Sequence, residues 1–130
     1  MRIVPRRRSA SLAVVALLAA LTAVCGEGTP QSMISGQVVE TYCWAKLGVG
    51  GPEHASCGIQ CVKRGIPAAI YDTESRQLFI LLPGQDKMSL PPDLIAAMGR
   101  NVHVRGEVIR RAGANFVAVQ SWEPSTAPRK

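Results

Sequence analysis

The sequence contains few of the groups on which the commonest catalytic and nucleic-acid-binding sites depend. Aromatic residues make up 5% of the 130 residues, too few for a row of stacking platforms along a single nucleic-acid strand. The chain has no phosphate-binding loop, no haem-attachment C-x-x-C-H motif and no serine-hydrolase nucleophile motif. The redox motif C-x-x-C is missing as well. These absences argue against nucleotide, haem and hydrolase sites.

The first 26 residues have the pattern of a targeting signal rather than of a folded element. Four arginines precede an uncharged apolar run that spans residues 12–24. This run is shorter than a transmembrane helix requires and has the length of a signal-peptide core. We therefore predict a signal peptide at residues 1–26 and export to the periplasm or cell envelope. Lipidation at Cys25 is the alternative, and a signal peptide or lipid anchor is the only membrane attachment that we expect.

The positive charge of the chain lies largely in this signal. The whole sequence has 15 Lys and Arg against 9 Asp and Glu, and four of the arginines fall in residues 1–26. The remaining chain keeps 11 basic and 9 acidic residues, a net charge of about +2. The high pI is therefore no evidence of nucleic-acid binding. About 104 residues remain, enough for one small domain.

Apolar alternation and turn residues predict one mainly β domain at residues 33–123, preceded by a tether at 27–32 and followed by a disordered tail at 124–130. We expect five strands, at residues 33–42, 67–71, 77–82, 101–110 and 116–122. Two short helices are expected, at residues 53–64 and 91–99, each with proline at its start and glycine at its end. This order matches a five-stranded OB-like barrel with a Cys/His-bearing helix inserted after the first strand. Another small open barrel or a two-layer α+β sheet is the alternative.

The fourth expected strand has the clearest two-residue alternation in the chain. Val102, Val104 and Val108 share one face, and His103 lies on the other. We expect the valines to line the barrel. We expect His103 to be solvated rather than part of a site.

Three of the four cysteines and one of the two histidines lie within nineteen residues. The pattern H-x-x-C-x-x-x-C places His54, Cys57 and Cys61 on one side of a helix. Cys43 ends the first expected strand, before a glycine-rich loop that can fold it back. A Cys₃His set is a familiar tetrahedral zinc site, and its thiolates also suit Cu(I). The sequence therefore predicts a zinc or copper site formed by Cys43, His54, Cys57 and Cys61.

The spacing of the cluster leaves other chemistries open. His54 and Cys61 are about 10.5 Å apart along a regular helix, so a shared ion is easier to hold if His54 lies in the turn before the helix. Three cysteines remain after the signal, and three cannot all pair within one chain. One alternative is therefore a protein-interaction domain that is stabilised by a disulfide from Cys43 to Cys57 or Cys61. Another is a thiol-dependent redox protein, favoured by the helix N-terminus and the histidine near Cys57.

Three segments carry most of this pattern: G-Q-V-V-E-T-Y-C-W, H-A-S-C-G-I-Q-C-V-K-R-G-I-P-A-A-I and N-V-H-V-R-G-E-V. Together they resemble a family of small exported bacterial proteins of uncharacterised function. The similarity spans roughly residues 35–122. The resemblance implies a common fold and a shared site at Cys43, His54, Cys57 and Cys61, and it implies no particular activity.

We therefore expect an exported cell-envelope domain that binds a zinc or copper ion and has no catalytic activity. Its expected partners are the ion or another envelope protein, and no nucleic acid.

Overall fold

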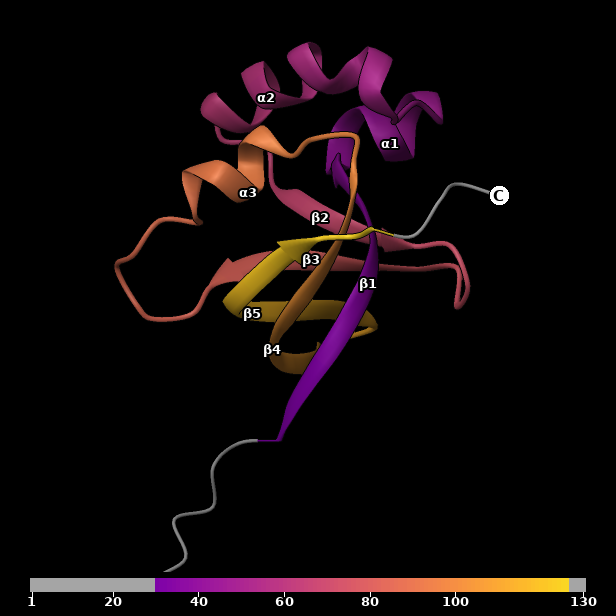
Figure 1. Ribbon diagram of the computed structural model, residues 1–130. Coiled ribbons are helices and arrows are strands. Elements are labelled where there is room, and N and C mark those ends of the chain that lie inside the picture. The colour runs from indigo at the N-terminus through magenta and orange to yellow at the C-terminus, as the bar shows by residue number, and fades with distance from the viewer. Residues whose placement is uncertain (1–29, 127–130) are drawn as a thin grey trace, which may run out of the picture.

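The structure, a computed structural model, describes residues 30–126 (Figure 1). The predicted signal peptide at residues 1–26, with Cys25, lies outside the described residues. Residues 127–130 of the predicted tail also lie outside them. Within residues 30–126, no helix is both long and apolar enough to cross a membrane.

Five strands form a closed barrel in the order β1-β2-β3-β5-β4. β3 and β5 run parallel, and the other neighbouring strands run antiparallel. This arrangement confirms the predicted OB-like barrel. The strands are β1 (Gln31–Glu40), β2 (Ala68–Asp72), β3 (Gln77–Pro83), β4 (Asn101–Arg111) and β5 (Ala114–Pro124).

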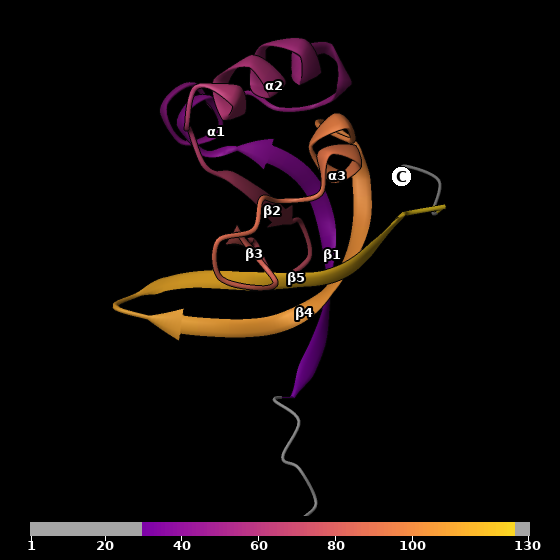
Figure 2. The ribbon, with the colours of Figure 1, turned by 90° about the vertical axis from the view of Figure 1, so that its left-hand side faces the viewer.

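The helices gather at one end of the barrel, as the two perpendicular views show (Figures 1 and 2). α1 follows β1 directly, and a 3₁₀ turn, η1, leads into α2. α2 is the predicted helix inserted after the first strand, and it contacts both β1 and α3. The helices are α1 (Thr41–Leu47), η1 (Pro52–His54), α2 (Ala55–Lys63) and α3 (Pro92–Ala96).

Both ends of β1 differ from the prediction. β1 begins at Gln31, so the last two residues of the expected tether belong to the strand and pair with β4. It ends at Glu40 because the chain turns into α1, a helix that the sequence pattern does not predict. The Glu40 carboxylate caps this helix by accepting hydrogen bonds from the backbone N–H groups of Tyr42, at 2.9 Å, and Cys43, at 2.7 Å. Cys43 therefore lies in the first turn of a helix, not at the end of a strand.

The barrel interior is apolar, and β4 supplies much of it. Val102 and Val104 are buried, and Val108 is half-buried and packs against the same core. His103 lies on the outer face, where its Nδ1 is 2.7 Å from the Oγ of Ser35. The expected inward and outward faces of this strand are therefore confirmed. β5 ends at Pro124, one residue into the expected tail.

Candidate metal centre

The predicted cysteine and histidine side chains meet at the barrel end that α1 and α2 cover. Cys43 comes from α1, His54 from η1, and Cys57 and Cys61 from α2. Cys43 is buried, His54 and Cys61 are half-buried, and Cys57 is exposed. All three of these cysteines are free thiols. The alternative disulfide from Cys43 to Cys57 or Cys61 therefore finds no support in the described residues.

The potential ligand atoms form two groups that share Cys43. In one group, the Cys43 Sγ, a ring nitrogen of His54 and the Cys57 Sγ all lie within 4.8 Å of one another. In the other, the Cys43 Sγ, the Cys61 Sγ and a carboxylate oxygen of Glu40 meet the same limit. Ligand atoms around tetrahedral zinc are about 3.5–4 Å apart, because Zn–S bonds are about 2.3 Å and Zn–N bonds about 2.0 Å long. Movements of the ligand atoms by about 1 Å would therefore bring either group to the spacing found around a zinc ion.

His54 lies in the turn before α2, the position that favours a shared ion. It is the last residue of η1 and the N-cap residue of α2. The backbone N–H of His54 donates to the Gly51 carbonyl at 3.1 Å. That carbonyl in turn packs closely on Gly99, where an added side chain would collide with it. The turn is thus held against the barrel. His54 belongs to the group of Cys43 and Cys57, and neither group of ligand atoms contains both His54 and Cys61.

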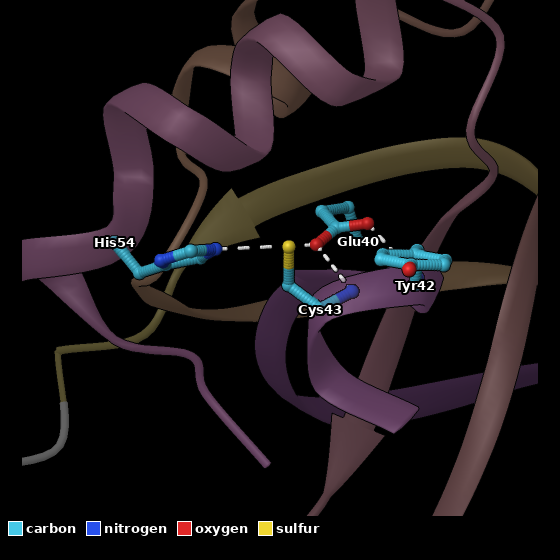
Figure 3. Close-up of polar contacts among 4 residues, drawn as sticks. All are labelled: Glu40, Tyr42, Cys43 and His54. Carbon is cyan, nitrogen blue, oxygen red and sulfur yellow. Dashed lines mark hydrogen bonds and ion pairs between the residues drawn. The ribbon is translucent and has the colours of Figure 1, made fainter. Parts of the chain in front are cut away.

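Glu40 is the member of the cluster that the sequence-based prediction misses. It is 2% exposed, and its carboxylate oxygen Oε1 lies 4.0 Å from the Nε2 of His54. This Nε2 is buried and has no hydrogen-bond partner. Figure 3 shows the imidazole of His54, the carboxylate of Glu40 and the sulfur of Cys43 turned toward one another, with a dashed line for the contact between His54 and Glu40. The sequence did contain a signal for this role. Glu40 lies on the same strand face as the buried Val38, and an acidic residue on a buried face is unusual.

Two thiols of the cluster, Cys43 and Cys61, have raised pKa values. A hydrogen bond to the Glu40 carboxylate, burial, and the negative charges of Glu40, Cys57 and Cys61 together raise the pKa of Cys43 to about 12. Burial and the charges of Glu40 and Cys57 also raise the pKa of Cys61. Both shifts have the same physical cause, the crowding of groups that become negative in a poorly solvated place. A bound cation reverses this effect, because it stabilises the thiolate forms.

Gly58 allows α2 to lie directly on the barrel end. A Cβ atom at this position would be 2.9 Å from the Cγ of Met98 and 3.4 Å from the Cγ of Glu40. A larger side chain would therefore push α2 away from the core. Cys57 and Cys61 would move with the helix, so the distance between their sulfurs and Glu40 depends on this glycine.

Comparison of the chain with protein-family models, curated proteins and solved structures found no match. The assignment of this site therefore rests on the chemistry and geometry of its own residues.

Proposed function

We propose that the protein is an exported cell-envelope domain that binds one zinc or copper ion, without catalysing a reaction, through Cys43, His54, Cys57 and Cys61. The observation that carries this proposal is the convergence of thiol and imidazole atoms within 4.8 Å around Cys43. Thiolate and imidazole are the ligands that zinc and Cu(I) prefer. Export is supported by the signal-like pattern of residues 1–26.

Metal binding accounts for the polar groups of the cluster better than a disulfide does. A disulfide would join two of the three thiols and leave the buried Nε2 of His54 without a partner. An unsatisfied buried polar atom destabilises a fold by about 1–3 kcal/mol. Coordination of an ion by this nitrogen and the Cys43 sulfur would give the nitrogen a partner.

Metal binding also agrees better with the pKa values than thiol redox chemistry does. A redox-active cysteine needs a lowered pKa, because the thiolate is the nucleophile. Here the pKa values of Cys43 and Cys61 are raised instead, which argues against these two thiols as redox nucleophiles. Metal binding tolerates raised values, since the ion displaces the protons when it binds.

The proposal is tested by anaerobic titration of the reduced protein with zinc and with Cu(I), in competition with a chromophoric chelator. The parent should bind one equivalent of at least one of the two ions. Cys43→Ser should weaken binding most, because Cys43 belongs to both groups of ligand atoms. Cys57→Ser, Cys61→Ser and His54→Ala should each weaken it less.

His103→Ala is the matched control for His54→Ala. It removes the other histidine, which lies on the outer face of β4 and contacts Ser35, so metal affinity should stay at the parental value. A parent that binds neither ion contradicts the proposal. So do four cluster variants that bind as tightly as the parent.

A further inference from the structure

The carboxylate of Glu40 is buried next to the thiols without a full positive partner. Its side chain has no exposed surface, and within residues 30–126 its one ion-pair contact is the His54 Nε2 at 4.0 Å. This distance is longer than a hydrogen bond, so the imidazole is not a close partner for the carboxylate charge. An uncompensated carboxylate in a protein interior is unfavourable, so the barrel end contains a place where a cation is stabilised.

The orientation of this carboxylate is set before any ion binds. One oxygen, Oε1, accepts the backbone N–H of Cys43 at 2.7 Å, and Oε2 accepts that of Tyr42 at 2.9 Å. Each carboxylate oxygen keeps a further lone pair after these two backbone bonds, and the Cys43 thiol that bonds to the carboxylate loses its proton when its sulfur binds an ion. A carboxylate oxygen of Glu40 also lies within 4.8 Å of the sulfurs of Cys43 and Cys61, which lie within the same distance of each other. The carboxylate is therefore fixed in reach of an ion that these two sulfurs bind.

We propose that Glu40 is itself a metal ligand, together with Cys43 and Cys61, and that it makes the site selective for a divalent borderline cation such as Zn²⁺ over the monovalent soft ion Cu(I). This inference rests on the proposed metal-binding function. Carboxylate oxygen is an ordinary ligand of zinc, whereas Cu(I) is selected by soft sulfur ligands. Glu40 therefore contributes a bond to zinc that it does not contribute to Cu(I).

The charge balance of the group favours the divalent ion as well. Glu40 and the thiolates of Cys43, Cys57 and Cys61 carry four negative charges when all are ionised. A divalent ion leaves a net charge of −2 at this site, and a monovalent ion leaves −3. Since net charge in a low-dielectric environment is unfavourable, the difference adds to the preference for Zn²⁺.

The test is the ratio of zinc affinity to Cu(I) affinity in Glu40→Gln. Glutamine keeps the length of the side chain and one acceptor oxygen for the α1 cap, but it removes the charge. We expect zinc affinity to fall at least about tenfold relative to Cu(I) affinity, the scale on which changes around a metal site act. The ratio is used because a general loosening of the fold lowers both affinities together.

Glu53→Gln is the matched control. It removes the same charge from an exposed position in η1, one residue before His54, and should leave the ratio unchanged. Cys61→Ser provides a second variant that does not touch the α1 cap. It removes a soft sulfur ligand, so it should lower Cu(I) affinity at least as much as zinc affinity, unlike Glu40→Gln. Thermal unfolding of each variant checks that the barrel is intact.

The outcomes separate this inference from the proposed function. If the parent binds neither ion, the proposed function fails. If the parent binds metal but Glu40→Gln leaves the ratio of zinc affinity to Cu(I) affinity at its parental value, Glu40 only caps α1 and the inference is overturned. A tenfold shift in the ratio for Glu40→Gln that Glu53→Gln does not reproduce supports it.

Discussion

Replacement of Val104 by aspartate tests the barrel assignment on which the position of the site depends. Val104 has no exposed surface and belongs to the main core cluster. Its neighbour His103 faces the opposite side of β4. The two positions are adjacent in sequence, but only one of them should be sensitive to a polar side chain.

The expected cost of Val104→Asp approaches the stability of the whole domain. Loss of a fully buried valine side chain costs about 1.5–3 kcal/mol. A carboxyl in the interior stays neutral, and its pKa rises by about 3 to 5. At pH 7, about 3 pH units above the ordinary pKa of aspartate, keeping this carboxyl neutral costs about 4 kcal/mol more, at about 1.4 kcal/mol per pH unit. The sum, about 5–7 kcal/mol, lies within the range of about 5–15 kcal/mol typical of whole domains, so the variant should be largely unfolded at pH 7.

Urea unfolding followed by circular dichroism at pH 7 and pH 4 measures this cost. Val104→Ala is the control for lost apolar contact, and His103→Ala should lie within about 1 kcal/mol of the parent. The folded-state pKa of the introduced carboxyl is raised above its unfolded value. The charge penalty is therefore small below pH 4 and grows as the pH rises. The assignment is refuted if Val104→Asp and Val104→Ala are equally stable at pH 7.

Two further predictions follow from the pKa shifts. Zinc affinity should keep rising with pH up to at least about pH 9, because the Cys43 thiol, whose pKa is raised to about 12, must lose its proton to bind. Competition titrations measure this affinity, and a constant value between pH 7 and pH 9 contradicts binding through the Cys43 sulfur. Asp72→Ala should destabilise the protein by up to about 1 kcal/mol at pH 7 and by less at pH 2. Partial burial raises the pKa of Asp72, but hydrogen bonds from the Ser75 hydroxyl and from the backbone N–H groups of Glu74 and Ser75 lower it overall. A carboxyl with a depressed folded-state pKa stabilises the fold above its unfolded pKa and loses this effect as the pH falls through the folded value. A destabilisation that is the same at both pH values in thermal unfolding argues against this role of Asp72.

The barrel could be predicted from the sequence because its signals are local. The alternation of Val102 and Val104 with His103 marks the inner and outer faces of β4 without reference to any other strand. Asp72 ends β2 directly before the turn to β3, and its side chain accepts the backbone N–H groups of Glu74 and Ser75 in that turn. The cysteine and histidine spacing predicted the cluster for the same reason, since His54, Cys57 and Cys61 lie within one turn and one helix.

α1 and the role of Glu40 could not be predicted in this way. Thr41, Tyr42 and Trp44 favour strands, and glutamate is not among the preferred N-cap residues. The helix forms because Glu40 caps its start and Gly48, at φ 66°, ends it in the left-handed region. Glu40 becomes part of the site only when α2 closes over it through the contact at Gly58. Both features depend on contacts between segments, which a local pattern does not contain.

The short chain separation of the cluster has a consequence for the order of folding. Glu40 and Cys61 are 21 residues apart in the chain, whereas Ser35 and His103, which face each other across β1 and β4, are separated by 68 residues. Closing the shorter loop costs about 1 kcal/mol less conformational entropy. The residues of the cluster can therefore come together before β1 and β4 pair. An ion that is present while the chain folds acts on a local segment first, and the long-range strand pairing follows.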